Sequence, residues 1–261
     1  MNADQLLNEL EAAGLTVKEL PGWKTRGGIW ATNNKPEGIM QHHTAAPVPY
    51  PPKRLADNNR IKANMNTKPD GTVWMIAYNA CNYSSGPGSK VVLEENVRPA
   101  LAPIANAKER GLADNYGGNR YFFNYENDHL GDGSSLPAVQ FDAIVDSTRV
   151  VLNHFGLVAD QVISHAEHTR RKVDPNWNGD NRTAINQIRT ALGEDMPLSE
   201  TDLEAIRETV REELDRELGG NPGPVSGFRG IGQAVVTTMV GRSGKNVGQL
   251  IQETWERVVN R

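Results

Sequence analysis

Hydrophobic residues recur at helical spacing most clearly in residues 137–155. The positions that would share one face of this helix are 141, 144, 145, 148, 151, 152 and 155. Pro137 suits the first turn of a helix, and Gly156 suits the position just after its end. The same period over shorter stretches predicts further helices at residues 3–13, 97–108 and 181–192.

Apolar runs predict β-strands between these helices. Residues 72–77 follow the turn signal Pro69-Asp70-Gly71 and are rich in strand-forming residues. Shorter apolar runs predict strands at residues 38–42 and 162–165, and each of these ends at a histidine.

Alternation of side chains predicts one more strand, at residues 120–127. Its two faces would carry Tyr121, Phe123 and Tyr125 on one side, and Phe122, Asn124 and Glu126 on the other. Because strands and helices intermix along the chain, the sequence indicates an α/β or α+β architecture.

The composition changes near residue 196, where we place a domain boundary. Residues 199–218 hold eight acidic residues and three arginines, with a narrow apolar stripe typical of a helix that packs on one partner. A Gly/Pro-rich linker follows at residues 219–227, and residues 248–259 resemble a final helix. We therefore predict a main domain, residues 1–196, and a helical C-terminal region, residues 197–261, with helical self-association as its preferred role.

Composition and charge exclude several classes of protein. A net charge of −4 without a basic run argues against a nucleic-acid partner. No run approaches the roughly 20 apolar residues that span a bilayer, and residues 1–10 lack the features of a secretory signal. Cys81 is the only cysteine in the sequence, so no internal disulfide is expected.

Two histidines and one acid predict a metal site. His42 and His165 each follow a short apolar run, so each is expected where a strand delivers its last side chains to the rim of a sheet. Asp174 lies nine residues after His165, beyond a loop long enough to fold back towards it. Catalytic zinc takes three protein ligands and keeps a fourth position for water. We therefore predict that these three residues bind Zn²⁺.

Each of these residues also has a simpler interpretation when it is taken singly. Adjacent histidines can be polar residues at a strand terminus, His165 can be a hydrogen-bonded residue at a rim, and Asp174 can form a turn. Only the combination predicts a metal, with His168 as an alternative ligand if the loop folds differently.

Five motifs extend this pattern along the chain. They are His42-His43-Thr44-Ala45, Asp70-Gly71-Thr72-Val73-Trp74, Tyr125-Glu126-Asn127, Ser164-His165-Ala166-Glu167 and Lys172-Val173-Asp174-Pro175. Together they resemble the zinc N-acetylmuramoyl-L-alanine amidases of the phage-lysozyme and peptidoglycan-recognition-protein type. The resemblance covers residues 20–192 and implies a central mixed β-sheet flanked by helices, with zinc in a groove on one face.

The resemblance also implies roles for individual residues. His42, His165 and Asp174 would be the zinc ligands, Glu126 the general base, and Lys172 a group that polarises the scissile carbonyl or stabilises the oxyanion. These roles agree with chemistry, because zinc lowers the pKa of a bound water to about 7 and a carboxylate can pass its proton to the leaving amine.

The predicted substrate contacts are Asn64 and Thr44. Many family members carry a tyrosine some residues before the Asp70-Gly71 turn, and this sequence has none there. Asn64 lies in that region and is predicted to replace it in substrate contact.

The function implied is that of an endolysin, a peptidoglycan hydrolase that cleaves the amide bond between N-acetylmuramic acid and L-alanine. A non-catalytic peptidoglycan-binding module and a zinc peptidase that cuts within the stem peptide are the alternatives. The complete ligand set favours an enzyme. We expect a protein made in the host cytoplasm without a signal peptide, which acts on the cell wall after release. Residues 197–261 would then support homo-oligomerisation or cell-wall binding.

Overall fold

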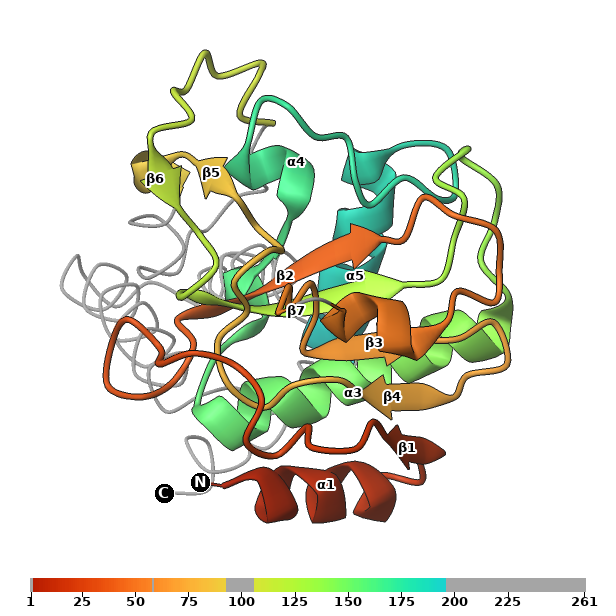
Figure 1. Cartoon of the computed structure of the whole chain (residues 1–261). Coiled ribbons are helices and arrows are strands. Elements are labelled where there is room, and N and C mark those ends of the chain that lie inside the picture. The colour runs from red at the N-terminus through yellow and green to blue at the C-terminus, as the bar shows by residue number, and fades with distance from the viewer. Residues whose placement is uncertain (1, 58, 93–105, 196–261) are drawn as a thin grey trace, which may run out of the picture. The chain divides into compact units, whose positions relative to one another are not determined.

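The computed structural model describes residues 2–57, 59–92 and 106–195, which form a layered α/β structure (Figure 1). The predicted helix at residues 97–108 lies mostly outside these residues, and its last three are not helical. The elements predicted after residue 196 lie outside them entirely. The chain divides into two compact units, Met1–Arg189 and Thr190–Arg261, and of the second the structure describes only residues 190–195. The predicted boundary at residue 196 stays a prediction.

A mixed sheet of six strands forms the centre of the described structure, in the order β1-β4-β3-β7-β2-β8. Its strands are β1 (Val17–Glu19), β2 (Gly38–His43), β3 (Met65–Thr67), β4 (Val73–Met75), β7 (Phe122–Asn127) and β8 (Val162–Ser164). Only β3 and β4 pair antiparallel; the other neighbours are parallel. A separate two-stranded sheet pairs β5 (Pro87–Gly88) with β6 (Tyr116–Gly117).

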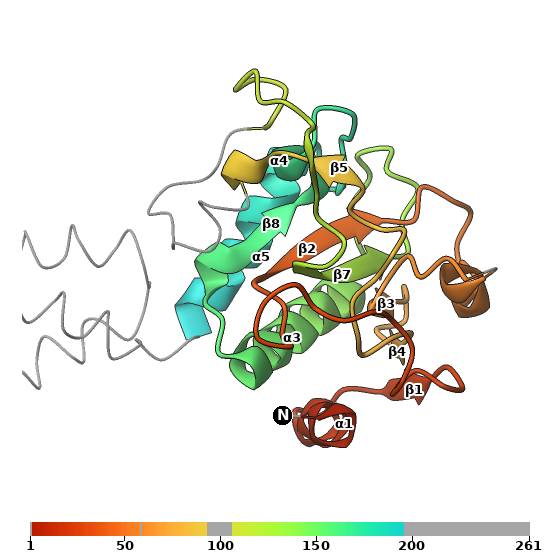
Figure 2. The same ribbon diagram turned by 60° about the vertical axis from the view of Figure 1, so that its left-hand side comes forward.

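The α-helices whose bounds fall within the described residues are α1 (Ala3–Ala12), α3 (Ala138–Phe155), α4 (His165–His168) and α5 (Asn181–Asp195). Short 3-10 helices lie at Pro52–Ala56 and Ala159–Gln161. Figure 2 shows α3 against one side of the sheet, with α1 beside it and α5 next to the β8 edge. This arrangement confirms the predicted mixed sheet flanked by helices. Among the described residues, no helix is long and apolar enough to cross a membrane.

The two faces of the central strands have different surroundings. On the face covered by α3, Gln41 of β2 donates a hydrogen bond to Thr148 and the ring of Phe123 packs near that of Phe155. On the opposite face, Met40 and Phe122 join an apolar cluster with Val92 and Ile163. Because side chains alternate along a strand, His42, Asn124 and Glu126 also leave the sheet on this second face.

Helix α3 confirms the prediction from hydrophobic spacing almost residue for residue. It begins after Pro137 and ends before Gly156. Gly156 has a φ of +65° and adopts the left-handed conformation that closes the helix. The strands at 38–42, 72–77 and 120–127 are also confirmed, within a few residues of their predicted ends.

One prediction about an element is wrong in a way that matters for the site. His165 does not end a strand: β8 stops at Ser164, and His165 is the first residue of α4. The hydroxyl of Ser164 accepts a hydrogen bond from the Glu167 amide while the Glu167 carboxylate accepts one from the Ser164 amide. This reciprocal cap starts a helix directly after the strand.

Candidate metal centre

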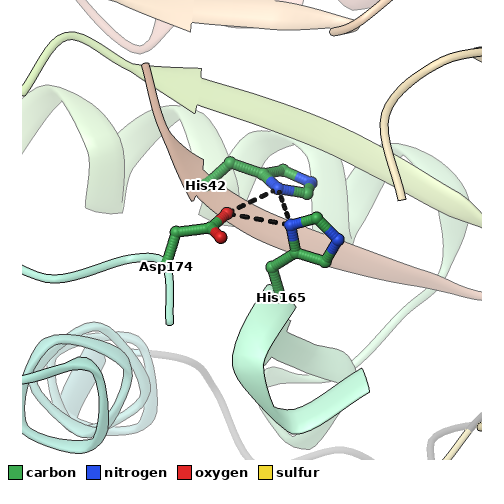
Figure 3. A group of neighbouring side chains, drawn as sticks. All are labelled: His42, His165 and Asp174. Atoms are coloured by element: carbon green, nitrogen blue, oxygen red, sulfur yellow. Dashed lines mark hydrogen bonds and ion pairs between the residues drawn. The ribbon is translucent and has the colours of Figure 1, made fainter. Parts of the chain in front are cut away.

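His42, His165 and Asp174 converge in the structure (Figure 3). His42 Nδ1 lies 2.9 Å from His165 Nδ1 and 3.0 Å from Asp174 Oδ2, and His165 Nδ1 lies 2.9 Å from the same carboxylate oxygen. All three side chains are buried. They come from the end of β2, the start of α4 and the loop that follows α4. The sequence predicted that these three residues converge, but it placed His165 at the end of a strand rather than at the start of a helix.

Strand pairing brings the two histidines together. Gln41 of β2 is the register partner of Ser164 of β8, so the residues that follow them, His42 and His165, emerge at the same edge of the sheet. The loop after α4 then returns to this edge, where the Ala166 amide donates a 3.0 Å hydrogen bond to the Asp174 carbonyl. The backbone therefore fixes the position of all three side chains.

The outer nitrogens of both imidazoles have acceptors, and this sets their tautomers. His42 Nε2 lies 3.0 Å from Asn124 Oδ1, and His165 Nε2 lies 3.2 Å from the Ser85 carbonyl oxygen. The Asn124 oxygen is an acceptor, because its amide nitrogen donates to the Phe122 carbonyl and the Ser85 hydroxyl donates to the oxygen itself. Each Nε2 then carries a proton, which leaves the lone pair of each Nδ1 turned inward.

Two nitrogen lone pairs and a carboxylate oxygen thus face one point. Such a set repels itself unless a proton or a cation lies among its members. Zinc bonds of about 2.0–2.1 Å place neighbouring ligand atoms about 3.3 Å apart in a tetrahedral site, close to the separations observed. The residues present therefore fit a small divalent cation, and the hydrogen-bonded Nε2 atoms are the support that metal-binding histidines usually have.

The charges of the cluster are strongly coupled. Burial opposes ionisation of Asp174, but the charges of His165 and His42 and their hydrogen bonds outweigh it and hold the pKa of this carboxyl well below its usual range. Burial, together with the charge of His42, lowers the pKa of His165 to about 4. Burial acts in the same direction on His42, but its hydrogen bond and charge interaction with Asp174 prevail and raise its pKa.

Glu126 and Lys172 lie within electrostatic reach of the cluster. Glu126 is the register partner of His42 on β7, and burial raises the pKa of its carboxyl to about 8. Positive charge on His42 and Lys172 acts against that increase. A cation in the cluster would act in the same direction as these two charges and bring the pKa of Glu126 down. Lys172 is exposed and stands two residues before Asp174. Both residues are therefore near the centre, and their predicted roles stay predictions.

The predicted substrate contact through Asn64 is not supported by the structure. Asn64 is fully buried, and its amide nitrogen donates to the carbonyls of Ala77 and Asn79. Its oxygen accepts from the Asn124 amide and the Cys81 thiol. With every polar atom occupied inside the protein, Asn64 instead supports the strand that carries Asn124.

The Thr44 hydroxyl is also engaged within the protein. It lies 3.4 Å from the His129 carbonyl oxygen and 3.3 Å from the His129 amide. The side chain is half-buried and links the end of β2 to the next loop. These contacts indicate a structural role for Thr44, and its substrate contact stays a prediction.

His168 does not belong to the cluster. Its ring is completely buried, lies edge-on to Phe122 and touches Gly88 and Gly118. Sequence reasoning also missed Asn124 and Ser85, the acceptors that orient the two histidines. The alternation of residues 120–127 placed Asn124 on the face of Glu126, which was the available signal. Nothing in the sequence pointed to the Ser85 carbonyl.

Two imidazoles and a carboxylate that converge on one point form a donor set of the kind that hydrolases use to hold a catalytic metal. A sequence model of the family described as N-acetylmuramoyl-L-alanine amidase matches residues 32–177. The chain belongs to this family, which confirms the resemblance that its motifs predicted and supports a peptidoglycan amidase function. The matched residues include all three members of the cluster and Glu126. A comparison with curated protein sequences found no match.

Several solved structures are similar to this chain at low identity. The endolysin amidase LysCS from Clostridium intestinale URNW is 14% identical, with 67% of this chain and 93% of that chain covered and a TM-score of 0.40. A selenomethionine derivative of AmpD is 11% identical, with 67% and 93% covered and a TM-score of 0.43. The PlyG catalytic domain is 12% identical, with 68% and 92% covered and a TM-score of 0.40. The assignment therefore rests on the family match and the site residues.

Proposed function

We propose that this chain is a zinc-dependent endolysin that cleaves the amide bond between N-acetylmuramic acid and L-alanine in peptidoglycan. The observation that carries the proposal is the convergence of two imidazole lone pairs and the Asp174 carboxylate. The family match supports the bond that is cleaved. The complete set of donors favours an enzyme over a module that only binds peptidoglycan.

His42, His165 and Asp174 would hold the zinc ion. When bound, zinc would acidify a water molecule and polarise the carbonyl of the lactyl group. The Asn124 side-chain oxygen and the Ser85 carbonyl would keep the imidazoles in the tautomer that binds metal, since each accepts a hydrogen bond from a protonated Nε2.

Glu126 would move the proton. Its carboxylate would accept a proton from the attacking water as the water oxygen bonds to the carbonyl carbon. It would then donate that proton to the nitrogen as the carbon–nitrogen bond breaks, so that L-alanine leaves with a free amine. Its position beside His42 on the same face of the sheet supports this role.

Lys172 would stabilise charge. The ammonium group is two residues from Asp174 and acts electrostatically on Glu126, His43 and His165. A positive charge at this place would offset the negative charge that develops on the carbonyl oxygen. Because peptidoglycan lies outside the cytoplasm, we also propose that the protein acts on the wall after release from the host cytoplasm.

The proposal is tested by digestion of purified peptidoglycan with the metal-free chain and with the zinc-loaded chain. We expect loss of turbidity only with zinc, and mass spectrometry should show stem peptides with a free L-alanine amine. Cleavage inside the stem peptide would instead identify a peptidase. Wall binding without any product would identify a binding module. Full activity in a His42→Ala, Asp174→Ala double variant would contradict the metal centre.

A further inference from the structure

His43 lies directly after the proposed ligand His42, and its side chain points to the other face of β2. There it meets two loops that are distant in sequence, residues 129–134 and 174–180. The Asn176 amide donates a 2.9 Å hydrogen bond to His43 Nδ1, and the Asn176 side-chain nitrogen donates a 2.8 Å bond to the Gly131 carbonyl. His43 therefore connects the end of β2 to the loop that carries Asp174.

The ring of His43 has little freedom in this junction. Gly131 has a φ of +77°, and a Cβ placed on it would lie 2.3 Å from His43 Nε2. The backbone of the 129–134 loop thus lies directly on the imidazole. That loop is itself fixed, since the Gly131 amide donates to His129 Nδ1 and the Gly133 and Gly179 backbones are hydrogen-bonded.

The chain around Asp174 is consequently held at two points. At the first point, the Ala166 amide donates a hydrogen bond to the Asp174 carbonyl, and Ala166 lies on the helix that carries His165. At the second point, the Asn176 amide donates a hydrogen bond to His43, which lies on the strand that carries His42. Each imidazole ligand therefore belongs to an element that also anchors the backbone of the carboxylate ligand.

We propose that His43 is a positioning residue, whose neutral imidazole accepts the Asn176 amide and thereby sets the Asp174 carboxylate for the cation. The inference rests on the metal centre proposed above and assigns to the second histidine of the pair a role that differs from that of the first. The acceptor at Nδ1 is what matters. An asparagine at position 43 can place its oxygen near that point, whereas a phenylalanine keeps a ring but has no acceptor.

The test compares wild type, His43→Phe and His43→Asn as full-length chains. Zn²⁺ affinity is measured by competition with a chelator, and the absorption spectrum of bound Co²⁺ reports the geometry of the ligands. Hydrogen exchange of the Asn176 amide is followed in the metal-free chains, so one measurement is independent of metal and of activity. We expect His43→Phe to lose about ten- to a hundred-fold in affinity, as changes beside metal ligands usually do, with a changed Co²⁺ spectrum and faster exchange. His43→Asn should stay within a few-fold of wild type.

A remote variant controls for loss of stability. His154 links α3 to Glu9 of α1 and to the Tyr78 hydroxyl, so His154→Leu should lower the melting temperature without any change in Zn²⁺ affinity. Wild-type affinity and spectrum in His43→Phe would overturn the inference, as would equal losses in His43→Asn or in the control. If the wild type itself binds no zinc, the metal centre fails as well, and the exchange of the Asn176 amide shows whether His43 still holds the loop.

Discussion

His165 and His168 stand three residues apart on the short helix α4, and both are buried. Burial lowers the pKa of both rings, to about 4 for His165 and to about 3 for His168. Their partners differ. His165 has an acceptor for its outer nitrogen and two inward neighbours, whereas both ring nitrogens of His168 lack a hydrogen bond within the described part of the chain. Burial and a shifted pKa therefore do not identify a ligand; convergent lone pairs do.

The largest difference should appear when each histidine is removed in turn. His165→Ala takes away a proposed zinc ligand and should reduce zinc affinity and amidase activity by more than the roughly hundredfold typical of a change beside the ligands. His168→Leu should leave zinc affinity within a few-fold of wild type, because the ring contacts Phe122 and two glycines rather than the cluster. Equilibrium dialysis of the two variants measures this. Equal losses would contradict the distinction between the two histidines.

The helix that carries both histidines depends on a buried ion pair. Arg189 of α5 binds both oxygens of Glu167 at 2.9 and 3.1 Å and also donates to the Val162 carbonyl. Arg189→Met would leave the Glu167 carboxylate buried and unpaired, which should cost about 3–5 kcal/mol in the free energy of unfolding. The exposed pair of Arg182 with Glu109 gives the control, and Arg182→Met should cost at most about 1 kcal/mol. Urea unfolding at neutral pH compares the two variants, and similar costs would contradict the larger contribution of the buried pair.

Acid should act on the metal-free protein through His168. Its pKa is below that of an unfolded histidine, so the unfolded chain binds more protons between pH 6.5 and about 3. The stabilisation from the neutral ring is complete above pH 6.5 and is lost as the pH falls towards 3. Between pH 7 and pH 4.5 this loss should be about 2–3 kcal/mol. His168→Leu should show an acid loss smaller by that amount in urea unfolding; an identical pH dependence in both chains would be evidence against the assignment.

The smallest effect should come from the acceptor behind His42. Asn124→Ala removes the oxygen that fixes the tautomer, and zinc affinity should fall by about ten- to a hundred-fold. Ser85→Ala is the matched change, because it removes a hydroxyl bound to the same oxygen and keeps the carbonyl used by His165. That variant should lose only a few-fold in chelator competition. If both variants bind zinc as tightly as wild type does, the Asn124 oxygen does not set the tautomer of His42.

How far the sequence predicts this molecule depends on the range of the interactions involved. Helix α3 and strand β7 follow from the spacing of apolar residues, since each is determined by its own segment. The three predicted metal ligands do converge, because the apolar runs before His42 and His165 place these two residues at one edge of the sheet and the loop after α4 returns Asp174 to it. Strands β1 and β3 span three residues each, too few for a period, and only the sheet defines them.

The wrong strand end at His165 and the unsupported substrate contact of Asn64 have a common physical origin. His165 opens a helix because of a reciprocal cap between Ser164 and Glu167, which overrides the apolar run before it. The Asn64 amide is occupied by four partners from two other segments, residues 77–81 and strand β7. Which polar atom meets which partner across the fold is a tertiary property, and a pattern along one chain does not contain it.

X-ray absorption of the zinc-loaded chain tests the central claim most directly. The proposed metal centre predicts one zinc bound by the described residues, with two imidazole nitrogens at about 2.0–2.1 Å and oxygen ligands completing the shell. One imidazole contribution should disappear in His165→Ala at any occupancy that remains. A spectrum without imidazole scattering, or one that His165→Ala leaves unchanged, would contradict the metal centre.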